Sequence, residues 1–146
     1  YNNKIYERAP KDLQILTHIC RGNFMSHWLY QGAYDDVADY VFAKEDIDGF
    51  FLEYDDERSG DFKALVKIPA GKKVVLGIVT SKRPELEDKE ELIKRIKDAA
   101  NYIPLENICI SPQCGFSSTE EGNAVTEEDQ WKKIALLKQV AEEVLI

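Results

Sequence analysis

Cysteine, long apolar runs and positive charge are all scarce in this sequence. Its 146 residues include three cysteines without a paired spacing, which argues against a secreted domain held together by disulfides. No apolar run approaches the ~20 residues that span a bilayer, and the first ten residues, YNNKIYERAP, are too polar for a signal peptide. We therefore expect a reducing, cytoplasmic location and no membrane partner.

The charge balance excludes another class of partner. There are 19 lysines and arginines against 27 aspartates and glutamates, a formal net charge of −8. An acidic surface repels phosphate backbones, so we expect no nucleic-acid partner. The remaining composition, 44% hydrophobic and 32% charged, is typical of one globular domain with a sizeable core.

Short apolar runs alternate with amphipathic stretches along the chain. The runs predict four strands, at residues 13–20, 49–54, 73–80 and 107–111. The amphipathic stretches predict helices or helical turns, at residues 34–43, 62–68, 84–100 and from 126 onward. Near-continuous apolar strands separated by helices indicate a parallel sheet in an α/β fold. Four such units fit a small doubly wound sheet or half of a (β/α)₈ barrel, which usually has about 250 residues.

The last helix has the clearest boundary signal. Thr126-Glu127-Glu128-Asp129 resembles a capping box in which Asp takes the place of Glu. Helical spacing predicts a buried side made of these apolar residues: Trp131, Ile134, Leu137, Val140, Ala141 and Val144.

Residues that can bind a metal lie where the predicted strands end. His18 and Cys20 close the first run, and residues two apart point to the same side of a strand. Glu53 closes the second run and Cys114 follows the fourth. Because ligands bind at the carboxyl ends of parallel strands, we expect these four residues to share one rim. Two thiolates and an imidazole favour zinc over magnesium or calcium.

Each of these residues also has a purely structural interpretation. A lone cysteine at a strand end is most often a small buried hydrophobe, and a lone histidine usually pairs with a backbone group. A buried, unpaired Glu53 would be costly, which favours a ligand role. A His-x-Cys pair with a distant Glu and Cys is no standard zinc motif, so spacing alone leaves both interpretations open.

The motifs taken together resemble the catalytic barrel of cobalamin-independent methionine synthase. The matching residues, in chain order, are His18-x-Cys20-x-x-Asn23-Phe24, Glu53 and Pro112-x-Cys114-Gly115. The phrases LEYDDERSGDF, VVLGIVTSKRPELE and SPQCGFSSTEEGN are similar to the single-barrel homologues of that enzyme. The resemblance extends from about residue 13 to the end of the chain.

This resemblance implies a ligand set and an architecture. It implies that His18, Cys20, Glu53 and Cys114 hold a Zn²⁺ ion. It also implies that residues 1–146 are the second, C-terminal half of a TIM (β/α)₈ barrel and a fragment of a longer protein. A half barrel has open parallel edges, so we expect self-association or other contacts to cover them.

The function implied by the resemblance is methyl transfer from 5-methyltetrahydrofolate, in its polyglutamate form, to the homocysteine thiolate, which gives methionine. A free thiol with a pKa of ~8.5 is mostly protonated at neutral pH, and zinc would activate it. No catalytic or cofactor-binding side chain is assigned beyond the metal ligands. The alternatives are a zinc-dependent alkyltransferase for another thiol, such as coenzyme M, and a non-catalytic zinc-bearing fragment.

The chain departs from the classical enzymes in two places. They carry a histidine implicated in proton delivery in the third-strand motif, which here reads Val79-Thr80-Ser81-Lys82. Basic residues that usually follow the last cysteine's glycine are replaced by FSSTEE, residues 116–121. These departures leave the methyl donor and the acceptor thiol open.

Several other polar residues receive weaker interpretations. Lys82 on the rim is a candidate for contact with an anionic group of the substrate, and residues 55–61 are expected to form a solvated loop. Cys109 lies inside the fourth apolar run and is expected in the core. His27 is expected at the surface.

Overall fold

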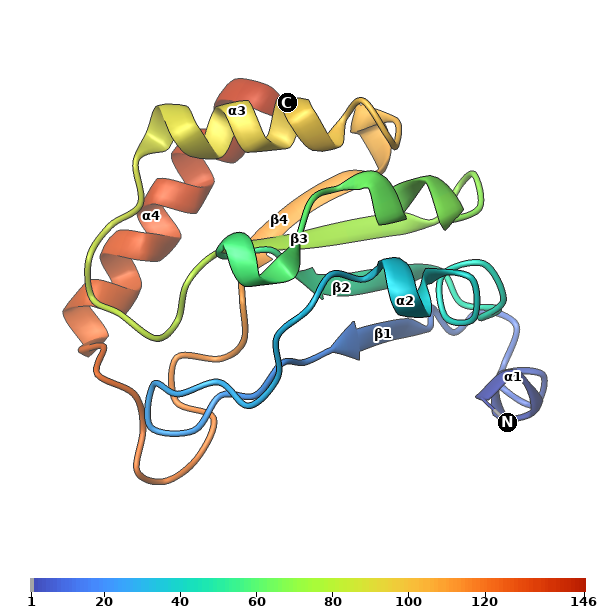
Figure 1. Ribbon diagram of the computed structural model, residues 1–146, viewed down its shortest axis with the longest axis horizontal. Coiled ribbons are helices and arrows are strands. Elements are labelled where there is room, and N and C mark those ends of the chain that lie inside the picture. The colour runs from blue at the N-terminus through green and yellow to red at the C-terminus, as the bar shows by residue number, and fades with distance from the viewer. Residues whose placement is uncertain (1) are drawn as a thin grey trace.

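The computed structural model describes residues 2–146 and contains one parallel sheet. Its strands are β1 (Leu16–Ile19), β2 (Gly49–Glu53), β3 (Lys73–Val79) and β4 (Ile108–Pro112). They are ordered β1-β2-β3-β4, and each neighbouring pair is parallel. Figure 1 shows β1 at one edge and the two long helices beside β4 at the other. The predicted α/β class and all four strands are confirmed.

The strand order distinguishes the two architectures that the sequence left open. A doubly wound sheet reverses its strand order at a switch point, whereas successive units of a barrel add strands in chain order. The observed order is therefore that of part of a TIM barrel. The helical segments that accompany the strands are α1 (Asn2–Tyr6), α2 (Asp35–Ala38), η1 (Glu57–Ser59), η2 (Lys63–Lys67), α3 (Lys89–Ala99), η3 (Leu105–Asn107) and α4 (Glu127–Val144).

Two helices are shorter than the sequence predicts. The helix expected over residues 34–43 is the single turn α2, followed by irregular turns. The apolar residues of this segment reflect packing into the core and not a long helix, because Tyr34 and Phe42 are both core residues. The helix expected from Pro84 begins at Lys89, where the Asp88 side chain accepts a hydrogen bond from the Glu91 N–H at 2.9 Å and caps it.

Helix α4 begins as predicted, and its buried side only partly matches the prediction: Leu137 and Val140 are buried as expected. Thr126 and Asp129 form the reciprocal capping box. The predicted buried residue Trp131 is 59% exposed, whereas Lys133 is fully buried. Lys133 Nζ lies 3.0 Å from the Glu87 carboxylate, and this ion pair is what permits a lysine on the packed side of the helix.

The two faces of the sheet are covered to different degrees. On one face Phe50, Leu52 and the alternate residues of β3 are fully buried. On the other face Phe51, Val75 and Cys109 are only half-buried, since successive side chains of a strand point to opposite faces. Cys109 is therefore not in the core, contrary to the prediction. No helix of residues 2–146 has the length and apolarity that a bilayer crossing requires.

Candidate metal centre

The structure brings His18, Cys20, Glu53 and Cys114 together at one end of the sheet. Their potential ligand atoms all lie within 4.8 Å of one another. His18 is in β1 and pairs in register with Phe51, two residues before Glu53 at the end of β2. Cys20 and Cys114 follow the last residues of β1 and β4. The parallel strands thus deliver all four side chains to the same rim.

Three of the distances within this group match those expected around a tetrahedral zinc ion. Ligands 2.0–2.3 Å from a tetrahedral metal are about 3.3–3.8 Å from each other. The two cysteine sulfurs are 3.5 Å apart, Cys114 Sγ is 3.8 Å from His18 Nε2, and His18 Nε2 is 3.7 Å from Glu53 Oε1. Cys114 Sγ is closer to Glu53 Oε1, at 2.6 Å, where the thiol donates a hydrogen bond. The two sulfurs, one imidazole and one carboxylate also match the donor preference of zinc.

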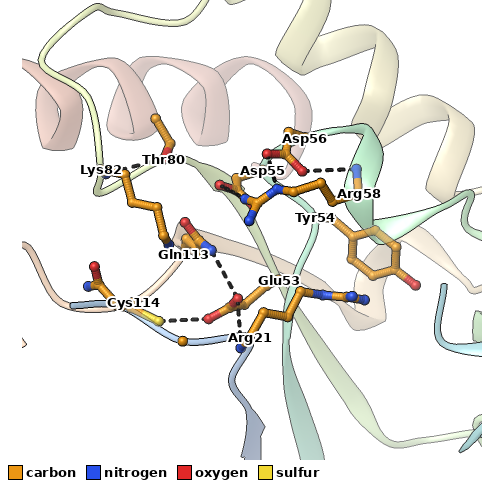
Figure 2. Close-up of polar contacts among 12 residues, drawn as sticks. Arg21, Glu53, Tyr54, Asp55, Asp56, Arg58, Thr80, Lys82, Gln113 and Cys114 are labelled. Carbon is orange, nitrogen blue, oxygen red and sulfur yellow. Dashed lines mark hydrogen bonds and ion pairs between the residues drawn. The ribbon is translucent and has the colours of Figure 1, made fainter. Parts of the chain in front are cut away.

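Glu53 is fully buried and held from three directions. Its Oε2 accepts hydrogen bonds from the Arg21 N–H at 3.1 Å and from Gln113 Nε2 at 2.9 Å, as Figure 2 shows. Its own N–H donates to the Tyr34 hydroxyl oxygen at 2.8 Å. With Oε2 occupied in this way, Oε1 is the oxygen that faces Cys114 and His18.

Cys20 is oriented by a glycine two residues later. The Gly22 N–H donates to Cys20 Sγ at 3.2 Å and fixes the position of the sulfur. Gly22 has φ +99°, and a Cβ at this position would lie 2.7 Å from the Leu29 backbone nitrogen. Only glycine fits this turn without strain.

Cys114 has an unfavourable environment for a free thiolate. Burial raises the pKa of the Cys114 thiol, and the hydrogen bond to Glu53 and the negative charge of that carboxylate raise it further. The thiol is therefore protonated at neutral pH until a cation replaces its proton.

An asparagine pair ties the loops of the rim together. Asn123 Nδ2 donates to Asn23 Oδ1 and to the Ser81 carbonyl oxygen, both at 2.9 Å. Asn123 Oδ1 accepts from the Ser26 N–H at 2.9 Å, and Asn23 Nδ2 donates to the Gly115 carbonyl oxygen at 2.8 Å. The segments after β1, β3 and β4 are thereby fixed to one another.

A hollow of about 330 Å³ adjoins the four-residue cluster. His18, Cys114, Phe51 and Ser111 are among its lining residues, so it opens on the less covered face of the sheet. A larger hollow of about 510 Å³ lies on the surface of α3, away from the cluster, and its lining includes Lys94, Arg95 and Asp98. Of these two hollows, the smaller one adjoins His18 and Cys114.

The residues that support the ligands were not predicted from the sequence: Gln113, Arg21, Tyr34 and Asn123 have no periodic signal of their own. Gln113 and Asn123 had one usable clue, their position within the matching phrase SPQCGFSSTEEGN, residues 111–123. Lys82 follows the end of β3, on the rim as expected, and is 5% exposed. His27 is exposed as predicted.

Comparison with known proteins agrees with this arrangement. Residues 4–138 match the family model described as cobalamin-independent synthase, catalytic domain. The chain is 48% identical over 144 residues to the uncharacterized protein YxjG of Bacillus subtilis, which covers 98% of this chain and 38% of YxjG. It is 30% identical over 111 residues to a methionine synthase of Pyrococcus abyssi, 75% of this chain and 29% of that protein.

A solved structure shows the same fold. A crystal structure from Listeria monocytogenes, whose description reads "putative vitamin-B12 independent methionine synthase", superimposes with a TM-score of 0.71 at 35% identity. The match covers 97% of this chain and 38% of that one, so the chain spans well under half the length of these relatives. The resemblance drawn from the sequence motifs is confirmed: the chain belongs to the cobalamin-independent methionine synthase family, within its catalytic domain.

Proposed function

We propose that this chain carries the zinc centre of a methyltransferase. The observation that supports the proposal most directly is the convergence of four ligand atoms, from three separated segments, within 4.8 Å. In this proposal His18, Cys20, Glu53 and Cys114 hold Zn²⁺. The family membership makes methyl transfer the reaction class to which such a centre would belong.

The proposed reaction moves a methyl group from 5-methyltetrahydrofolate to homocysteine and yields methionine. Zinc, when bound, supplies a Lewis acid that keeps a substrate thiol deprotonated at neutral pH. The chain's own residues hold the ligand set and admit the substrate. Arg21 and Gln113 fix the Glu53 carboxylate, and the hollow beside Cys114 provides room for the thiol.

The ligand set has a charge suited to this role. Two thiolates and one carboxylate contribute three negative charges, against two positive charges from zinc. The centre then has a formal charge of about −1 before substrate binds, which keeps a bound sulfur electron-rich.

We further propose that residues 1–146 form the C-terminal half of the catalytic barrel. The strand order and the coverage of about 38% of YxjG and of the Listeria protein support this. The half-buried face of the sheet, with Phe51 and Val75, would then line the barrel interior. The remaining walls of the substrate site would come from the rest of the protein.

One departure from the classical enzymes keeps a different acceptor thiol open. The third-strand motif, which carries a histidine in those enzymes, reads Val79-Thr80-Ser81-Lys82 here, and the Thr80 N–H donates to Glu87 Oε1 at 2.9 Å. The Thr80 side chain has no group that titrates near neutral pH, so proton delivery would differ from that of the classical enzymes. An alkyltransferase that acts on another thiol, such as coenzyme M, is the second candidate.

The test combines metal content with turnover in the full-length protein that contains this chain. We expect one zinc per chain and methyl transfer from methyltetrahydrofolate to homocysteine, both abolished by Cys114→Ser. Zinc without turnover on homocysteine, but with turnover on coenzyme M, would support the second candidate. Zinc without any turnover, together with unfolding on chelation, would indicate a non-catalytic metal-bearing fragment.

A further inference from the structure

Two buried polar side chains beside Glu53 lie outside the four-residue cluster. Gln113 is 4% exposed and Lys82 is 5% exposed. Gln113 Nε2 donates to Glu53 Oε2, but within residues 2–146 neither Gln113 Oε1 nor Lys82 Nζ has a hydrogen-bond partner. An unpaired buried ammonium is expensive, and so is an unpaired buried amide oxygen. Gln113 Oε1 therefore needs a hydrogen-bond donor, and Lys82 Nζ needs an acceptor.

The two side chains come from neighbouring strand ends. The Gln113 N–H donates to the Val79 carbonyl oxygen at 2.8 Å, and Lys82 follows Val79 by three residues. Figure 2 shows the Lys82 side chain extending toward the Gln113 amide. A lysine side chain is long and flexible, and its ammonium group has three donors. A rotation about the terminal bonds of Lys82 would therefore bring its Nζ to Gln113 Oε1.

We propose that Lys82, Gln113 and Glu53 form a hydrogen-bond relay that positions Glu53 as a metal ligand. An ammonium can only donate and a carboxylate can only accept. An amide placed between them is held in one orientation, with its oxygen toward Lys82 and its NH₂ group toward Glu53. The relay secures Glu53 Oε2 and leaves Oε1 for the ion. Lys82 and Gln113 are thus positioning residues and do not touch the metal.

Asp55 is the other acid within electrostatic reach of Lys82. Its Oδ2 lies 3.3 Å from an Arg58 guanidinium nitrogen, and its Oδ1 is buried without a hydrogen-bond partner within residues 2–146. Lys82 has three donors, so a contact with Asp55 leaves donors for Gln113 as well. Asp55 alone would not satisfy Gln113 Oε1, which needs a donor of its own.

The inference rests on the proposed function in one respect, that the cluster binds a metal. The test measures the Zn²⁺ dissociation constant of the full-length protein that contains this chain, by competition with a chromogenic chelator. Partners of metal ligands typically change metal affinity 10–100-fold when they are removed. We expect Gln113→Met to weaken Zn²⁺ binding by about that factor. We expect Lys82→Met to weaken it in the same direction.

Whether Lys82→Met weakens or tightens Zn²⁺ binding distinguishes the relay from a purely electrostatic effect of the lysine charge. Removing a positive charge near a bound cation would by itself tighten binding, so weaker binding indicates loss of orientation. Because both residues act through Glu53, the double variant should bind Zn²⁺ no more weakly than Gln113→Met within about threefold. Lys82→Arg, which keeps a donor, should restore part of the affinity.

Controls and a second readout distinguish positioning from stability. Lys133→Met removes another buried lysine, which pairs with Glu87, and should lower stability without changing Zn²⁺ affinity. Absorption bands of the Co²⁺-substituted protein should shift in Gln113→Met and not in Lys133→Met. If Gln113→Met does not fold, Gln113→Asn serves instead, because its shorter amide cannot span from Lys82 to Glu53.

The outcomes that overturn the relay are distinct from those that overturn the proposed function. Unchanged Zn²⁺ affinity in Gln113→Met, or tighter binding in Lys82→Met, overturns the relay while the metal centre stands. A wild-type chain that binds no Zn²⁺ overturns both. Additive losses in the double variant show that the two residues act independently, which also rejects the relay.

Discussion

Glu53 and Cys114 lie 61 residues apart in the sequence, and their side chains meet at 2.6 Å between Oε1 and Sγ. The contact joins the ends of β2 and β4, which do not neighbour each other in the sheet. Strand β3 lies between them, and the backbones of Leu52 and Gln113 approach it closely at Gly77, where a Cβ would lie 3.0 Å from Gln113 Cα. This close approach at Gly77 lets side chains from β2 and β4 reach one centre.

Cys114→Ser should abolish stoichiometric Zn²⁺ binding, because serine replaces a soft thiolate with a weakly acidic hydroxyl. The matched control is Cys109→Ser, since Cys109 is a half-buried free cysteine of β4 outside the cluster. Elemental analysis of the two purified variants gives the answer. Equal zinc content in both would contradict the assigned ligand set.

Zn²⁺ affinity should rise steeply with pH. The pKa of the Cys114 thiol is raised by burial and by Glu53, so the ion must displace a proton that is firmly held. Lowering the pH increases the competition from protons, and the apparent dissociation constant becomes larger. Chelator competition between about pH 6 and pH 8 measures this dependence, which Cys109→Ser should leave unaltered. An affinity that does not vary with pH would contradict a protonated Cys114.

Asn123→Ala should loosen the rim and weaken metal binding. The variant loses the hydrogen bonds to Asn23, Ser81 and Ser26 that join three loops. We expect a loss of about 1–3 kcal/mol in the free energy of unfolding and a Zn²⁺ affinity lower by about tenfold.

Asn101→Ala is the matched control for this experiment. Asn101 is exposed and makes a long 3.4 Å contact with Asp98, so its loss should change neither quantity. Urea denaturation and hydrogen exchange of residues 22–27 provide the measurements. Unchanged exchange in Asn123→Ala would show that the loops hold together without it.

Thr126→Ala should destabilise the fold while leaving the metal centre intact. The threonine hydroxyl accepts from the Asp129 N–H at 3.2 Å and closes the capping box of α4. Loss of such a cap costs about 1 kcal/mol. Thermal unfolding should shift to lower temperature and Zn²⁺ affinity should stay at the wild-type value, whereas Thr126→Ser should retain most of the stability.

The strands and the rim position of the ligands followed from local patterns. Each strand is a short apolar run, and Glu53 is conspicuous as an acid that ends such a run. Parallel strands in sequence order then bring their carboxyl ends together whatever the details of packing. Little tertiary information was needed to place His18, Cys20, Glu53 and Cys114 on one rim.

The buried side of α4 required information that the sequence does not contain. A stripe through Trp131 and one through Lys133 both have helical spacing, and hydrophobicity alone favours the first. The structure buries Leu137 and Val140 of the first stripe but exposes Trp131. It buries Lys133 in its place because Glu87, from the loop between β3 and α3, neutralises the lysine. Likewise, Asn123 reaches partners 97 and 100 residues away, Ser26 and Asn23, that no local pattern reveals.

The 3.5 Å separation of the Cys20 and Cys114 sulfurs has a practical consequence for anyone who purifies this protein. Oxygen or peroxide that draws them to the ~2.05 Å of a covalent disulfide would remove two soft donors at once. Preparations handled in air and under reductant should therefore differ in how much metal they retain, and the oxidised material should regain it after treatment with a dithiol.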